Sequence, residues 1–501
     1  MTATPNSARS KSGHASLRTT TARAASAALT LWHGSAAAHS FGRIYNLPVP
    51  FWLYVYGASA ALLLSFLILG YFMTAPRAQA PARSVDLRHR RWVGALRRLR
   101  FTRILGWLAL GLLLLCIATG LWGSRDPYRN FNMTFFWVVF VLGFAYLTAL
   151  IGDLYAAINP WRALAHLIGT RWHGFARGRL RYPERLGYWP ALVLYMAFIW
   201  IELFAFVRPF KLAVLLGLYS LITLSGVWLY GAGAWLRHGE FFGVFLRLIA
   251  KMAPIDYVPG HRLRLRAPFT GALQGHAADW SLLLFVLFML SSTAFDGLRA
   301  TVPWFQLFWG DATGLIEGWI GQKPIYAYPW LRPYYLAYES IWLLASPFLY
   351  LSVYLLFVAV SRWLGGGTAG LREVALRFGY SLIPIALVYH VTHYYTLLLN
   401  QGPKIVSLMS DPFGYGWNLF GTAGLLRAPI LPDPGTVWHT QVGLILFGHI
   451  VSVYLAHVEA LRLFPTPRRA LLSQVPMLLL MVAFTAAGLW ILAQPIQSGR
   501  G

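Results

Sequence analysis

The sequence predicts an all-α protein, a polytopic transmembrane helical bundle of about ten spans. Of its 501 residues, 57% are hydrophobic and only 12% are charged, a composition typical of multi-pass membrane proteins. Apolar runs of about 20 residues, long enough to cross a bilayer as a helix, recur along the chain. They lack the short alternating pattern of barrel strands, and a helix satisfies its own backbone hydrogen bonds in hydrocarbon.

The predicted spans follow a distinct N-terminal segment. Residues 1–38 are at first polar and basic and then carry a short apolar stretch ending in three alanines, which predicts a disordered N-terminus and a possible signal peptide. Residues 39–501 form a single transmembrane helical domain. The spans lie near residues 49–74, 101–123, 134–158, 187–208, 211–232, 278–299, 334–360, 372–399, 437–463 and 473–495.

Loops rich in lysine and arginine alternate with less basic loops along the chain. The loops after the first, third, fifth, seventh and ninth spans are basic, and the others are short or less basic. Because positive residues in short loops mark the cytoplasmic side, both termini are expected on the outer side of a bacterial inner (plasma) membrane. The formal charge of +26 is therefore attributed to topology and to anionic lipid. The expected partners are the bilayer and a lipophilic small-molecule substrate, with no nucleic acid, and the sequence leaves open whether there is a partner subunit.

Several local patterns add to this framework. The single cysteine, Cys116, excludes an intrachain disulfide and a thiolate metal cluster. GEFFGVFLRLIAKMAP predicts an amphipathic helix that lies along the membrane interface or on the protein surface. GDLYAAINPW predicts a helix stop capped by polar side chains. SDPFGYGWNLFG predicts either a lid over the outer mouth or an ordinary connecting loop.

Histidines inside apolar segments are the main indication of function. His390 and His393 lie in LVYHVTHYYTLLLN, and His439, His449 and His457 follow on the next span. An ionisable side chain in hydrocarbon is costly and marks a functional site by default. His390 and His393 are three residues apart and share a helix face, so one helix can offer two metal ligands. For His457 a hydrogen bond between helices is the simpler interpretation.

Carboxylates on three other spans are expected at a similar depth. Asp296, Glu202 and Glu339 are the candidate catalytic groups, and with His390, His393, His449 and His439 they would form a mixed site for a divalent transition metal, zinc or copper. Signal cleavage would make His39 the N-terminal residue, whose amine and imidazole form a further candidate ligand pair.

Seven segments of the chain together resemble one family. AHSFGRIYNLPVPFWLY, GDLYAAINPWRAL, YWPALVLYMAFIWIELF, GEFFGVFLRLIAKMAPI, SSTAFDGLRAT, SDPFGYGWNLFG and HTQVGLILFGHIVSVYLAH are similar to the bacterial polytopic membrane proteins called fenitrothion hydrolase. The similarity extends over roughly residues 37–495. It implies hydrolysis of an organophosphorus triester with release of a nitrophenol, and it assigns no catalytic residues. The extended basic N-terminus departs from shorter relatives.

Three functions remain open at this point. The first is a membrane-embedded hydrolase in which a bound metal activates water and polarises the phosphoryl group. The second is a metal or small-solute transporter, in which histidines at graded depths along one helix would form successive binding sites on the transport path. The third is a haem-bearing electron carrier in which His390 or His393 pairs with His449. No G-x-x-x-x-G-K-[ST] loop is present, so ATP-driven transport would need another chain.

Overall fold

The computed structural model describes residues 49–72, 84–258, 262–426, 428–430 and 432–494. Within these ranges ten helical segments are long and apolar enough to cross a membrane. The predicted all-α polytopic bundle is therefore confirmed, and the chain is a multi-pass membrane protein. The expected signal peptide and His39 lie outside the described residues and stay predictions.

The ten spans are joined by shorter helices. In chain order the spans are α2 (Phe51–Phe72), α5 (Phe101–Trp122), a third built from α6 (Phe131–Met133), η1 (Thr134–Phe144) and α7 (Ala145–Ile151), then α10 (Trp189–Phe204), α11 (Pro209–Tyr230), α14 (Trp280–Arg299), α17 (Tyr328–Gly365), α19 (Ile383–Gln401), α21 (Pro434–Leu463) and α22 (Pro467–Ala493). The connecting helices are α4 (Arg91–Arg98), α8 (Tyr155–Ile158), α9 (Pro160–Arg171), α12 (Ala232–His238), α13 (Phe241–Ile249), α15 (Val302–Trp309), α16 (Leu315–Ile320), α18 (Leu371–Phe378) and α20 (Ile405–Ser410).

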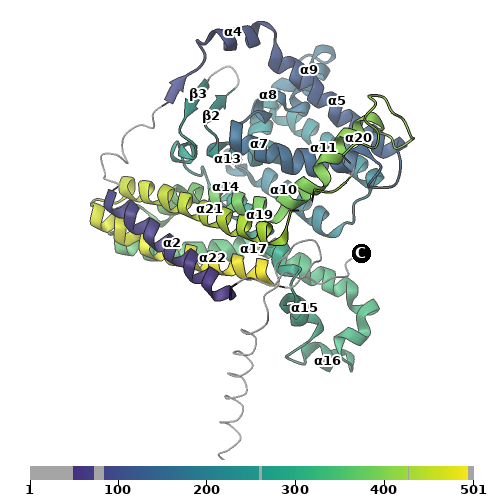
Figure 1. The fold of residues 1–501 in the computed structure, drawn as a ribbon. Helices are drawn as coiled ribbons and strands as arrows, with labels where there is room; N and C mark the ends of the chain where they lie inside the picture. The colour runs from purple at the N-terminus through teal and green to yellow at the C-terminus, as the bar shows by residue number, and fades with distance from the viewer. Residues whose placement is uncertain (1–48, 73–83, 259–261, 427, 431, 495–501) are drawn as a thin grey trace, which may run out of the picture.

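The spans form two groups that meet at α19. Helices α2, α21 and α22 lie together on one side, and α5, α9 and α11 lie together on the other (Figure 1). Helix α19 packs against both α21 and η1, and α14 packs against α10, α17 and α19. Phe51 and Tyr54 at the start of α2 pack with Leu492 and Ala493 at the end of α22. The first span therefore begins at the end of the bundle where the last span finishes. The placement of this end on the outer side of the membrane stays a prediction.

A small sheet joins two of the basic loops. Strands β1 (Ser84–Asp86) and β2 (Ile255–Val258) both pair antiparallel with β3 (Arg262–Arg266), in the order β1-β3-β2. The loop after the first span is thereby bonded to the loop after the fifth. The alternation of arginine and leucine in RLRLR is the period-two pattern of a strand, although the segment is too short to be distinctive by itself.

The third span is shorter than predicted and has an unusual interior. Thr134–Phe144 is a π-helix, and the helix stops at Ile151 rather than near residue 158. Gly152 follows with a φ of 145°, and a Cβ there would lie 2.5 Å from the carbonyl oxygen of Ile255. The predicted polar caps are confirmed: Asp153 accepts from the backbone N–H of Ala156, and Asn159 caps α9.

The interfacial or surface placement expected for GEFFGVFLRLIAKMAP is wrong. Helix α13 is buried within the protein, with Phe241 3% exposed and Val244 fully buried. Phe241 and Phe242 contact Phe198 of α10 and Tyr219 of α11. The segment carries apolar side chains on nearly its whole circumference, and a helix that is apolar all round is buried.

Glu240, the N-cap of α13, is expected to make stability depend on pH. Its fully buried carboxylate accepts hydrogen bonds from Tyr219, Asn159 and two backbone N–H groups. Burial raises the pKa of Glu240 from 4.5 to about 7, because these bonds only partly offset desolvation. The folded state therefore prefers the protonated carboxyl. Relative to Glu240→Gln, the wild type should lose thermal stability as pH rises from about 4.5 to about 7, with no further relative loss above it. A constant difference across that window would contradict this account.

Candidate functional site

A cluster of ionisable side chains lies between α10, α14, α17 and α19. Its centre is a contact of 2.8 Å between His393 Nε2 on α19 and Asp296 Oδ2 on α14. Tyr394 donates its hydroxyl to the same carboxylate oxygen at 2.9 Å. The side chains of His393 and Asp296 are 25% and 18% exposed, so the pair is largely enclosed and still reachable.

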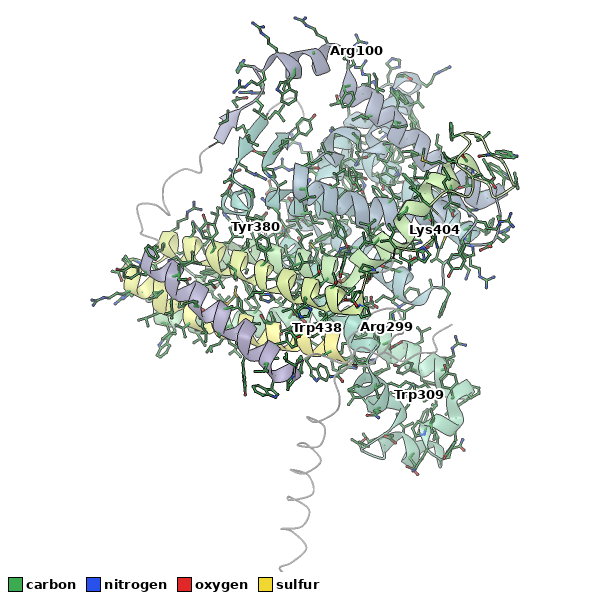
Figure 2. All side chains as sticks on the ribbon, viewed as in Figure 1. Arg100, Arg299, Trp309, Tyr380, Lys404 and Trp438 are labelled. Carbon is green, nitrogen blue, oxygen red and sulfur yellow. The ribbon has the colours of Figure 1, made fainter. Side chains whose placement is uncertain are left out.

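Arg299 connects this pair to α17. Its Nη1 lies 3.6 Å from Asp296 Oδ1, and its Nε lies 3.6 Å from Oε1 of the buried Glu339. The guanidinium also lies over the ring of Phe204, 4.8 Å from the ring centre. Figure 2 places Arg299 near the end of the bundle where α15 and α16 branch off. One cation thus faces carboxylates from two helices in a largely enclosed environment.

Glu202 and His390 line a small cavity beside the pair. The cavity has a volume of about 20 Å³ and is otherwise walled by apolar or aromatic side chains, Phe140, Phe242 and Phe245 among them. That volume is enough for about one water molecule. The ring of Tyr394, bonded to Asp296, lies 5.0 Å from that of His390, centre to centre, so Tyr394 joins the two halves of the cluster. Glu202 also interacts electrostatically with Asp296.

Helical spacing explains how the sequence assembles these groups locally. Residues three or four apart lie on one helix face. His390, His393 and Tyr394 accordingly project together from α19, and Asp296 and Arg299 project together from α14. A Cβ at Gly297 would lie 3.9 Å from the ring of His393, an ordinary contact, and 2.8 Å from Ile491 Cγ2, so the missing side chain leaves room for α22 beside α14. The shared face predicted for His390 and His393 is confirmed.

The other predicted ligands lie elsewhere. His449 is fully buried, bonds its own helix at the Ile445 carbonyl through Nδ1, and lies beside the ring of Tyr389 on a different face of α19 from His390. His439 is exposed and faces Tyr54 on α2. His457 bonds Gln474 of α22, in agreement with the interhelical hydrogen bond expected for it.

Among the described residues no group of three or more His, Cys, Asp and Glu side chains is placed to hold a metal ion. His393 and Asp296 point at each other, and Arg299 lies beside Asp296. A guanidinium at this position repels a second cation, so the arrangement does not fit a metal held by these two residues. The zinc or copper site stays a prediction from the sequence.

Sequence reasoning missed three members of the cluster. Arg299 lies three residues after Asp296 in SSTAFDGLR, and an arginine so close to the end of a span was a usable signal. Tyr394 is four residues after His390, on the same helix face. Tyr146 of α7 donates its hydroxyl to the His390 carbonyl, a contact between residues 244 positions apart that no local pattern announces.

The expected lid loop lies away from the cluster. The backbone oxygens of Pro412 and Phe413 accept from Phe131 and Ser124, which bonds this loop to the connection between α5 and α6. The Asp411 carboxylate accepts from the backbone N–H groups of Tyr415 and Gly416. These contacts agree with the connecting-loop interpretation.

The charge balance limits what the cluster can do chemically. Asp296 and Glu339 each lie 3.6 Å from the permanent cation of Arg299, and Glu202 interacts electrostatically with Asp296. A net negative charge in a poorly solvated interior is costly, so each charged group here depends on its hydrogen bonds and ion pairs. The cluster therefore combines an orienting carboxylate, an imidazole and exchangeable protons, the elements of general acid–base chemistry.

No protein-family model matches the chain, and no curated protein or solved structure is detectably similar to it.

Proposed function

We propose that this protein is a membrane-embedded hydrolase of lipophilic esters, organophosphorus triesters among them, with His393 as its general base. The observation that carries the proposal is the contact of 2.8 Å between His393 and Asp296, largely enclosed within the bundle. A carboxylate that accepts one imidazole N–H orients the ring and makes the other nitrogen the basic one. The resemblance to fenitrothion hydrolases supports the choice of substrate.

The reaction follows from this arrangement. Asp296 holds the proton on Nε2, so Nδ1 takes a proton from the attacking water. The water oxygen forms a bond to phosphorus while the bond from phosphorus to the aryl oxygen breaks, and nitrophenolate leaves with the electron pair. Protonated His393 returns its proton to solvent, and the Asp296 carboxylate stabilises the imidazolium in the meantime. General-base assistance of this kind contributes about 10²–10⁴-fold to a rate.

Hydrolysis by protein in liposomes tests the proposal directly. Release of nitrophenol from a nitrophenyl phosphotriester is followed for wild type and His393→Ala. We expect the variant to lose about 10²-fold or more of the turnover. His166→Ala, which removes an exposed histidine on α9, is the matched control and should retain activity.

Two results would overturn the proposed function. Wild type that hydrolyses no faster than buffer would exclude it for these substrates, and an active His393→Ala would remove its base. The metal predicted from the sequence is tested in the same assay. Activity that survives chelation supports the histidine–carboxylate mechanism, whereas its loss together with a stoichiometric metal would replace that mechanism by metal-activated water.

Proton-coupled transport is a second candidate, favoured by the excess of carboxylates over fixed cations in the cluster. Intramembrane Asp, Glu and His side chains commonly form proton relays. The same liposomes, loaded with a pH indicator, distinguish the two functions. Proton movement lost in Glu202→Gln without any ester hydrolysis would favour transport. The haem hypothesis loses support because His449 faces Tyr389 rather than His390 or His393.

A further inference from the structure

A large apolar pocket lies against the third span and shares the wall residue Phe140 with the small polar cavity. It has a volume of about 560 Å³, within the range of about 300–1,000 Å³ common for ligand sites. Its walls come from α5, the third span, α8, α9, α11 and α19, and from the turn after α19. Residues that represent these walls are Cys116, Phe135, Phe140, Leu147, Trp161 and Leu398.

The lining indicates a ligand without charge. None of the lining residues is Asp, Glu, Lys, Arg or His. The indole N–H of Trp161 already donates to Ser220 Oγ at 2.9 Å. The pocket therefore offers hydrophobic and dispersion contacts almost exclusively, and these contacts favour hydrocarbon.

The shape and position of the pocket favour a long chain taken from the bilayer. Its wall on the third span extends from Phe135 to Leu147, up to about 18 Å at about 1.5 Å per residue. One leaflet of the hydrocarbon core is about 15 Å thick, so an extended acyl chain matches this length. Leu147 is 40% exposed on a span, which places the pocket edge on the side of the bundle where lipid tails lie.

We propose that this pocket binds one acyl chain of a membrane lipid. The proposal does not depend on the hydrolase function. The bound acyl chain would lie close to the polar cluster, because Phe140 lines both this pocket and the small cavity beside Glu202 and His390. Phe140 contacts Phe242, which lines the small cavity but not the large pocket, with ring centres 5.1 Å apart.

Gly143 offers a way to fill the pocket. A Cβ at this position would lie 3.5 Å from Leu398 Cδ1, an ordinary contact, so a longer side chain would extend into the space that Leu398 lines. Gly111 on α5 is the matched control. It is exposed, does not line the pocket, and has no heavy atom within 4 Å of its Cβ position. Gly143→Leu and Gly111→Leu thus make the same substitution inside and outside the pocket.

Photo-crosslinking in liposomes tests the proposal. The probe is a phosphatidylcholine with a diazirine near the end of one acyl chain, and adducts are located by peptide mass spectrometry. We expect adducts on the lining residues of α5 and the third span, reduced about tenfold in Gly143→Leu and unchanged in Gly111→Leu. Excess unlabelled phospholipid should reduce the same adducts in wild type, a measurement that needs no variant.

Each alternative outcome is informative. Adducts spread evenly over all lipid-facing helices would overturn the proposal. Equal labelling of Gly143→Leu and Gly111→Leu would also overturn it, provided that thermal unfolding curves show both variants to be folded. Labelling by a diazirine-bearing palmitic acid but not by the phospholipid would also overturn it, because the pocket would then bind a free lipophilic acid. Binding is read without ester hydrolysis, so failure of the hydrolase function leaves this result standing.

Discussion

Replacing Asp296 with asparagine is expected to reduce turnover of a nitrophenyl phosphotriester by about 10³–10⁴-fold. The asparagine side chain keeps the shape of the carboxylate, but its amide can present an N–H to His393 Nε2. That reverses the tautomer, so Nδ1 carries the proton and cannot accept one from water. Steady-state turnover and KM in liposomes measure the effect. Because Asp296 acts through His393, turnover should fall while KM changes little.

The control for this prediction is the same aspartate-to-asparagine substitution at a position outside the cluster. Asp433 caps α21 by accepting from the Thr436 N–H, and asparagine is an equally good cap. Asp433→Asn should therefore remain active. A purely structural role for Asp296 would appear as loss of folded protein at every pH, without a change in the pH profile of the remaining activity. Wild-type turnover in Asp296→Asn would contradict the mechanism.

Replacing Arg299 with methionine is expected to destabilise the protein by about 3–5 kcal/mol. The change removes the cation that lies 3.6 Å from both Asp296 and Glu339, and the side chain of Glu339 is only 5% exposed. A carboxylate left without its counter-ion in the interior keeps its desolvation cost and loses its compensation. Chemical unfolding in detergent, compared with wild type, measures the loss.

Two further variants locate the cause of this loss. Arg299→Met combined with Glu339→Gln should recover much of the stability, because the second change removes one of the uncompensated charges. Arg377→Met breaks the more exposed pair with Glu373, in which the two side chains are 34% and 51% exposed, and should cost about 0–1 kcal/mol. Equal losses of unfolding free energy in Arg299→Met and Arg377→Met would show that the interior ion pairs stabilise the protein no more than the pair between Arg377 and Glu373.

The candidate site was only partly predictable. The shared face of His390 and His393 follows from helical spacing, and Asp296 was recognised as a partner because it lies near a span end of matching depth. The position of His449 did not follow, because sequence gives the depth of a residue in a span but not the direction in which it points. His449 points toward Tyr389, whereas His393 points toward Asp296.

The ten spans and the all-α class follow from the amino-acid sequence alone. Hydrocarbon imposes a minimum apolar length and requires each segment to satisfy its own backbone, and both constraints are local. Tertiary packing brings His393 to Asp296, 97 positions away, buries α13, and sets an acyl-sized pocket against Phe140, which also lines the cavity beside Glu202 and His390. These features depend on how each helix is rotated and packed against its neighbours. In lipid the hydrophobic effect does not select that packing, so it rests on small residues such as Gly297 and on polar contacts between distant segments.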